Sequence, residues 1–184
     1  TVDSAGQRSD IFSSVLGQAI LQPYPSWHPK ILKAWLTHNT QLALKTFDYT
    51  THKSAWADIA RSANEHNDPG TFTTFIGYEF TTSTDTEGGN LHRNVIFNSS
   101  KAPIRPWTRI DSLNPEDLWT WQDALREKGM DSVSMPHNSN GSNGQMFESE
   151  TFKANAINKA YAEKRMRNEP IVEITQVKGT SETH

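Results

Sequence analysis

The chain has 184 residues, of which 34% are hydrophobic and 21% charged, and its formal net charge is −3 at pH 7. The length fits one domain or part of a larger one. The absence of cysteine excludes disulfide scaffolds, thiolate zinc sites and cysteine nucleophiles, and the six Trp, eight Phe and four Tyr argue against disorder. Without a basic stripe, nucleic acid is not an expected partner, and the apolar runs fall far short of the ~20 residues that span a bilayer.

The two ends of the sequence are abrupt. The chain starts Thr-Val-Asp-Ser-Ala-Gly, without an initiator Met or a signal-peptide pattern, and it ends Gly-Thr-Ser-Glu-Thr-His. We therefore expect the rest of the same polypeptide on both sides, with this chain as a central fragment. The lack of cysteine is compatible with an oxidising compartment, which favours a periplasmic or secreted location over a cytoplasmic one.

Helical patterns dominate the first third of the chain. Ile11, Val15 and Ala19 have helical spacing until a proline-rich stretch ends the run, and a second helix is predicted from Ile31. A better helix is predicted from Ser54, and Asn-Asp-Pro-Gly stops it after residue 66. We take residues 1–53 as a variable helical and loop region and residues 54–184 as the segment that carries the motifs, all within a single domain fragment.

Strands and helices alternate after residue 70. Residues rich in β-formers predict strands at Thr71–Thr82 and Leu91–Phe97. A helix is predicted to begin at Asn114, because a capping residue, a proline at the first helical position and two early acids follow one another there. The remaining predicted elements are a strand at Ser132–Met135, a loop at 137–144, a helix around 153–167 and a strand at Ile171–Thr175.

This alternation predicts an α/β fold with βα units and a mainly parallel sheet or barrel. In such folds, polar residues just past the C-terminal ends of strands gather ligands and catalytic groups. Glu79, His137 and the segment 179–184 fall at or beyond predicted strand ends. They are therefore the first candidates for a functional site.

Two candidates lie around the first pair of predicted strands. Glu79 is an ionisable group near the end of a β-like run, so burial would require a cation, a metal or hydrogen-bond donors, while the simpler alternative is a Glu that points out of an edge strand. His92 is a residue type that binds Zn, Mn and Fe together with carboxylates, although a lone His is more often packed or at the surface. Arg93 beside it has a planar donor fork that suits an anionic substrate oxygen.

His137 is the strongest of the seven histidines. It follows a short strand and opens the loop His-Asn-Ser-Asn-Gly-Ser-Asn-Gly, whose small polar residues can orient ligands or approach an anion; the alternative is an ordinary surface loop. Glu182 and His184 lie two residues apart, so on an extended segment they form a workable ligand pair, unless they belong to a frayed tail. The histidines at 28, 38, 52 and 66 have structural or surface contexts.

Several enzyme classes lack their motifs here. The sequence contains no Gly-x-Ser-x-Gly elbow, no Gly-x-x-x-x-Gly-Lys phosphate loop and no Gly-x-Gly-x-x-Gly dinucleotide motif. A glycosidase-type pair of carboxylates stays open, although nothing singles out a pair.

Four stretches of the chain closely resemble the domain of unknown function 3604 family, which looks like a branch of the polymerase and histidinol phosphatase (PHP) superfamily of metal-dependent hydrolases. The stretches are residues 70–80, 90–97, 135–144 and 167–184, and the match spans roughly residues 54–184. The resemblance implies part of a distorted PHP-like βα barrel with two or three divalent ions at the strand ends. Mn or Zn are expected first, with Fe as a further option.

The resemblance also implies roles for individual residues. Gly-Tyr-Glu at 77–79 matches the Gly-x-Glu element of the superfamily, which implies that Glu79 bridges two metals, and His92 and His137 match two separate ligands. The opening His-x-His and the Asp-His element are absent. His184, in Glu-Thr-His, resembles the final Asp-x-His in form and is a further candidate ligand, although family members continue beyond this point.

We therefore expect a metal-dependent hydrolase that uses metal-activated hydroxide on a small anionic or ester substrate, with phosphoesters first and carboxylic esters second. Glu79 and Arg93 are the expected catalytic residues, and Arg93 with Asn138, Asn140 and Asn143 is expected to bind the substrate. The alternative is a non-catalytic binding or structural module, or an inactive fragment that lacks the remaining ligands.

Overall fold

The computed structural model describes residues 48–83, 89–177 and 179–181. The chain divides into two compact units, Thr1–Ala55 and Trp56–His184. The helices predicted before residue 48 lie outside the described residues. Helix α5 (Tyr49–Glu65) confirms the helix predicted from Ser54 and begins earlier, where the Asp48 carboxylate accepts hydrogen bonds from the amides of Thr50 (3.0 Å) and Thr51 (3.3 Å).

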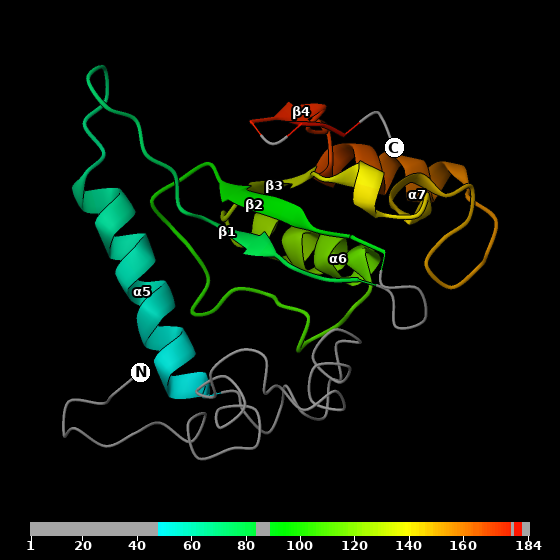
Figure 1. Ribbon diagram of the computed structural model, residues 1–184. Helices are drawn as coiled ribbons and strands as arrows, with labels where there is room; N and C mark the ends of the chain where they lie inside the picture. The colour runs from blue at the N-terminus through cyan, green and yellow to red at the C-terminus, as the bar shows by residue number, and fades with distance from the viewer. Residues whose placement is uncertain (1–47, 84–88, 178, 182–184) are drawn as a thin grey trace, which may run out of the picture. The chain divides into compact units, whose positions relative to one another are not determined.

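The second unit is built on a three-stranded sheet in the order β1 (Gly77–Phe80), β2 (Arg93–Phe97), β3 (Ser132–Pro136) (Figure 1). Both strand pairs are antiparallel. Glu79 lies opposite Asn94, which in turn lies opposite Met135. The strands predicted at 91–97 and 132–135 are thus confirmed within two residues at their ends.

The expected parallel pairing is wrong for these three strands. The segment 98–113 runs back along the sheet after β2: the amide of Asn98 donates to the carbonyl of Asp131 at one end, and the Thr82 hydroxyl donates to the carbonyl of Leu113 at the other. Helix α6 (Pro115–Arg126) then runs parallel to β2. Strand β3 returns after the helix and is therefore antiparallel to β2. The order of helices and strands in the sequence does not reveal that segment 98–113 runs back along the sheet. The barrel architecture stays a prediction.

The two faces of the sheet have different surroundings. Side chains alternate between the faces along each strand, and every second residue of β2 and β3 is buried. The buried face packs against α6, and the hydrophobic core of the unit comprises Trp56, Ile76, Phe80, Val95, Phe97, Leu118 and Leu125. The other face presents Glu79, Asn94 and Met135, all less buried. This second face is the one that carries the candidate site.

Helix α6 begins as the sequence predicts. The Asn114 side chain accepts a hydrogen bond from the amide of Glu116 (2.9 Å), and Pro115 occupies the first helical position. After the helix, Gly129 adopts a positive φ of 75°, which glycine tolerates without steric cost. Among the described residues, no helix has the length and apolar character needed to cross a membrane.

The C-terminal third departs from the prediction in two places. Helix α7 spans only Lys159–Asn168, with Asn158 as its cap, and follows two short 3₁₀ turns, η1 (Ser139–Gly141) and η2 (Gln145–Phe147). The strand predicted at Ile171–Thr175 is wrong: residues 171–174 form no ladder, although the amide of Glu173 donates to the carbonyl of Pro136 (3.0 Å). Only β4 (Thr175–Gln176) pairs, with β5 (Gly179–Thr180). The apolar side chains that suggested a strand are exposed.

The strand predicted at Thr71–Thr82 is shorter in the structure, where only Gly77–Phe80 joins the sheet. Before it, Asp68 and Phe72 form an isolated antiparallel bridge, and the Thr74 hydroxyl donates to the carbonyl of Ala63 at the end of α5 (2.5 Å). These contacts tie the threonine-rich stretch to the helix. The β-forming residues before Gly77 therefore make a connection and not a strand.

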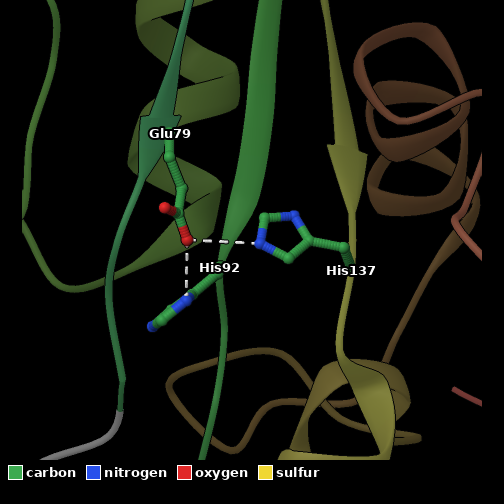
Figure 2. A group of neighbouring side chains, drawn as sticks. All are labelled: Glu79, His92 and His137. Carbon is green, nitrogen blue, oxygen red and sulfur yellow. Dashed lines mark hydrogen bonds and ion pairs between the residues drawn. The ribbon is translucent and has the colours of Figure 1, made fainter. Parts of the chain in front are cut away.

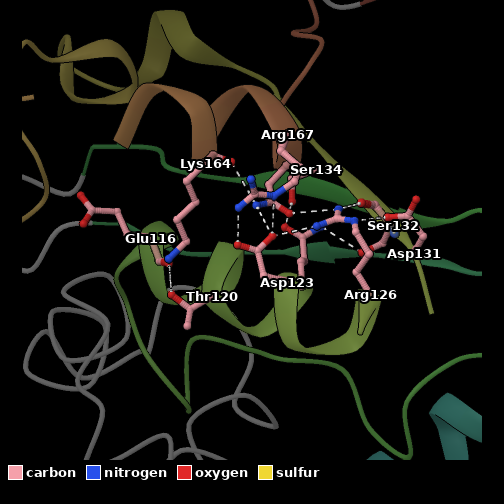
Figure 3. A network of polar contacts seen from close by, with 11 residues as sticks. Glu116, Thr120, Asp123, Arg126, Asp131, Ser132, Ser134, Lys164 and Arg167 are labelled. Carbon is pink, nitrogen blue, oxygen red and sulfur yellow. Dashed lines mark hydrogen bonds and ion pairs between the residues drawn. The ribbon is translucent and has the colours of Figure 1, made fainter. Parts of the chain in front are cut away.

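A polar network joins α6, α7 and β3 (Figure 3). The Asp123 carboxylate accepts hydrogen bonds from Arg126 (2.7 Å), Arg167 (2.7 Å) and Asn168 (3.1 Å). Beside it, the buried Gln122 side chain bridges the hydroxyls of Ser132 (3.0 Å) and Ser134 (2.8 Å) on β3. The network fixes both helices to the buried face of the sheet.

Candidate metal centre

Three side chains of metal-ligand type meet at one end of the sheet (Figure 2). Glu79 lies in β1, His92 immediately precedes β2, and His137 immediately follows β3. Antiparallel pairing places the C-terminal ends of β1 and β3 beside the N-terminal end of β2, and the amide of His137 donates to the carbonyl of His92 (3.3 Å). The sequence predicted all three residues. The antiparallel pairing explains why His92, near the start of its predicted strand, lies beside two residues near the ends of theirs.

The register places these side chains on the same face. Glu79 is opposite Asn94 across the first pair, and Asn94 is opposite Met135 across the second. His92 and His137 each lie two residues from one of these positions, so the period of two turns their side chains to the face that Glu79 occupies. Residues far apart in sequence thus converge through ordinary sheet geometry.

The distances fit a shared ion. Glu79 Oε1 is 2.9 Å from His92 Nδ1 and 3.2 Å from His137 Nε2, and the candidate ligand atoms all lie within 4.8 Å of one another. Bonds of about 2.0–2.2 Å to a tetrahedral ion separate its ligand atoms by about 3.3 Å. A divalent ion therefore fits among the three groups after small side-chain movements.

The electrostatics favour neutral imidazole. Burial above all lowers the pKa of His92, the Glu79 carboxylate opposes this, and the charges of His137 and Arg93 lower it further, so the net shift is downward. A neutral imidazole is the form that coordinates a metal. The Glu79 side chain is 44% exposed while that of His137 is only 7% exposed, so the centre has a buried side and an open side.

One ring nitrogen of His137 lacks a hydrogen-bond partner among the described residues. This atom, Nδ1, is buried, whereas Nε2 faces Glu79. Metal-binding histidines ordinarily donate from their second nitrogen to a carboxylate, a carbonyl or water. We therefore expect that the complete centre supplies an acceptor for Nδ1 from outside the described residues or from solvent.

Asn90 supports the centre, and the sequence prediction missed it. The side-chain Oδ1 atom of Asn90 accepts a hydrogen bond from the backbone amide of His92 (2.8 Å). The backbone amide of Asn90 donates to the carbonyl of Gly141 (3.0 Å). Asn90 thus links the two histidine-bearing segments. The one signal for it in the sequence was its place in the stretch Asn-Leu-His that carried the family resemblance.

The loop after His137 holds the three asparagines predicted to bind substrate. Asn138 and Asn143 adopt left-handed backbone conformations with φ of 55° and 53°, which Asn tolerates better than most residues. Asn138 is half-buried, whereas Asn140 and Asn143 are exposed. The Ser139 hydroxyl donates to the carbonyl of Ser181 (2.9 Å), which attaches this loop to the segment after β5.

Arg93 does not lie at the centre, contrary to the predicted substrate-binding and catalytic role. Its side chain is turned to the buried face of the sheet, where Nε donates to Glu169 Oε1 (2.6 Å) and Nη1 donates to the carbonyl of Leu91. The two charged side chains are 2% and 1% exposed. The physical reason is strand alternation, since consecutive residues point to opposite faces. His184 lies outside the described residues, so its predicted role as a ligand stays a prediction.

Comparison with known proteins identifies the family. A family model matches residues 18–184. The chain belongs to the family described as "Protein of unknown function (DUF3604)". No curated protein and no solved structure matches it. The family description of this DUF3604 chain assigns no activity, so its function has to be argued from the site.

Proposed function

We propose that this chain is part of a metal-dependent hydrolase of ester bonds, related to the PHP superfamily, in which Glu79, His92 and His137 hold divalent ions. The observation that carries the proposal is the convergence of these three residues on one face of the sheet with ligand atoms within 4.8 Å. Exposed carboxylates often lie together by chance, but this group also includes two imidazoles, one partly buried and one buried.

The donor set indicates which metals to test. Two imidazole nitrogens and a carboxylate oxygen suit Zn, Mn and Fe, whereas Mg and Ca prefer oxygen ligands. Glu79 has two carboxylate oxygens, so it is able to bridge two ions, as the resemblance implies. The number of ions, two or three, and a role for His184 belong to the same proposal.

The chain's own residues set the conditions for the reaction. A bound divalent ion would lower the pKa of a water molecule and polarise the ester group. The buried His137 closes one side of the centre, while the exposed edge of Glu79 leaves room for the substrate. Asn138 follows His137 directly, and we propose that its amide, with those of Asn140 and Asn143, donates hydrogen bonds to the anionic part of the substrate.

Phosphoesters are the first substrate class, on analogy with the superfamily, and carboxylic esters are the second, because the same activated water attacks either. Purified protein loaded with Mn²⁺ or Zn²⁺ should hydrolyse p-nitrophenyl phosphate or p-nitrophenyl acetate. His137→Gln should lower kcat/KM by more than about 100-fold, since loss of an outer partner already costs up to about that much. His66→Gln, at an exposed helix-end position, is the matched control and should leave activity unchanged.

A non-catalytic metal-binding module is the second candidate. It is favoured by the small size of the ligand set, which comprises only three side chains among the described residues. Such a module would bind metal through Glu79, His92 and His137 but would hydrolyse neither phosphoesters nor carboxylic esters. Hydrolysis that survives unchanged in His137→Gln, or no hydrolysis by the metal-loaded protein, would contradict the proposed enzyme.

A further inference from the structure

A second candidate site lies on the opposite face of β2 from the metal centre. It is a pocket of about 330 Å³ between the start of β2, α6, α7 and the segment after η1. Its wall includes the aromatic side chains of Trp119, Phe152 and Tyr161. Pockets of this volume fall at the small end of the range that binds organic molecules.

The inner end of the pocket carries more positive than negative charge. Arg93 and Arg165 both line it, and both donate to the single carboxylate of Glu169, at 2.6 Å and 3.1 Å. Trp119 Nε1 donates to the same carboxylate (2.9 Å). Two guanidinium groups thus share one buried carboxylate, and the further contacts of Arg165, with the Met146 carbonyl (2.8 Å) and the rings of Trp119 and Phe147, carry no negative charge.

Arg93 also has donors to spare. Of the five N–H groups of a guanidinium, the described residues engage only Nε, with Glu169, and Nη1, with the carbonyl of Leu91. The side chain is 98% buried, since only 2% of it is exposed, and yet it lines the pocket. A buried cation with unused donors calls for an anionic group, and a carboxylate matches the guanidinium geometry.

The outer part of the pocket has the opposite charge. Glu116, Glu148 and Glu150 line it, and Glu148 and Glu150 are exposed. The Glu116 carboxylate accepts a hydrogen bond from the amide of Phe152 (2.6 Å), whereas the carboxylates of Glu148 and Glu150 have no partner among the described residues. A ligand that carried only negative charge would be repelled here, and one that carried only positive charge would be repelled at the inner end.

We propose that this pocket binds a small zwitterion of the amino-acid type, with its carboxylate at Arg93 and Arg165 and its ammonium group at Glu148 and Glu150. The aromatic wall would cover an apolar side chain of the ligand and attract the ammonium group. The site is independent of the proposed hydrolase activity, because none of its lining residues belongs to the metal centre.

Three probes of one shape separate the charges. L-phenylalanine carries both, 3-phenylpropionate lacks the ammonium group, and phenethylamine lacks the carboxylate. In calorimetric titrations of the purified protein, phenylalanine should bind at least about tenfold more tightly than either single-charge probe, since each charged hydrogen bond contributes about that much. Equal affinity for either single-charge probe and phenylalanine, or no binding of phenylalanine, would overturn the proposal.

Two sets of variants test the assignment of each end. Glu148→Gln with Glu150→Gln changes only exposed positions, so the fold is preserved, and the affinity for phenylalanine should fall to that for 3-phenylpropionate. Arg165→Gln should weaken the binding of both carboxylate probes. Glu163→Gln, exposed on α7 and outside the pocket, is the control and should change neither affinity. If the double variant binds phenylalanine as tightly as the control, the ammonium end is assigned wrongly and the proposal fails.

Discussion

His92 and Arg93 are neighbours in the chain, but their side chains lie on opposite faces of the sheet. His92 Nδ1 is 2.9 Å from the Glu79 carboxylate on one face, and Arg93 Nε is 2.6 Å from the Glu169 carboxylate on the other. The start of β2 therefore carries a candidate metal ligand and a buried ion pair side by side. The two faces can be examined separately, because a mutation at one of these side chains leaves the contacts on the other face in place.

Loss of the buried counter-charge should destabilise the fold. In Glu169→Gln, Arg93 and Arg165 would keep their charges in the interior without a carboxylate, and breaking a buried ion pair costs about 3–5 kcal/mol. Urea unfolding measures this loss. Glu163→Gln, the same change at an exposed position of α7, should cost less than about 0.5 kcal/mol. Equal stability of the two variants would show that Glu169 is not the counter-charge for these arginines.

Acid should weaken the network between α6 and α7. Hydrogen bonds from Arg167 above all, with Asn168 and the charges of Arg167 and Arg126, lower the pKa of Asp123 to about 2 from an ordinary value of 3.8. Because the folded pKa is the lower one, this stabilisation is present above pH 4 and is lost as the pH falls from about 4 to 2.

Asp123→Asn should therefore remove part of the acid dependence of stability in that window while it lowers stability at pH 7. Chemical unfolding at a series of pH values gives the comparison. Asp58→Asn, whose carboxylate is exposed on α5, is the control and should keep the wild-type pH profile. An Asp123 variant with the same acid profile as wild type would contradict the assignment.

The cap of α6 should contribute to stability on its own. Asn114→Ala removes the acceptor for the amide of Glu116, and such a loss typically costs about 1 kcal/mol. Asn114→Asp keeps an acceptor at the same position and should be close to wild type. The measurement is the midpoint of urea unfolding. Equal stability of the Ala and Asp variants would mean that the side-chain cap contributes nothing.

The sequence predicted local structure better than the way in which strands pair. The cap and proline at Asn114 and Pro115 act within one turn of helix, so the start of α6 could be read directly. The direction of β3 depends on the return of the chain along segment 98–113, which has no local signature. The apolar run from Ile171 was predicted to be a strand, but a strand needs partners to pair with, which the sequence pattern does not identify.

The candidate site was predicted in part for the same reason. Glu79 and His137 were identified from their positions at strand ends, His92 from its ligand chemistry, and all three from the family resemblance. Sheet geometry brings them together. Arg93 was assigned to the substrate because its donor fork suits an anionic oxygen and it follows His92. Its actual partner, Glu169, lies 76 residues further along the chain, beyond the reach of any local pattern. Asn90 was missed because its contribution is a hydrogen bond to backbone, which no motif specifies.

Metal binding tests the central claim most directly. We would titrate Zn²⁺ and Mn²⁺ into the purified wild-type protein and into Glu79→Gln by calorimetry, with Glu65→Gln, at an exposed position of α5, as the matched control. Wild type and control should bind at least one ion per chain, and Glu79→Gln should bind at least about tenfold more weakly with an unchanged unfolding midpoint in the absence of metal, because the charge is lost while the volume barely changes. Equal affinities of Glu79→Gln and wild type, or no binding to wild type, would contradict the metal centre.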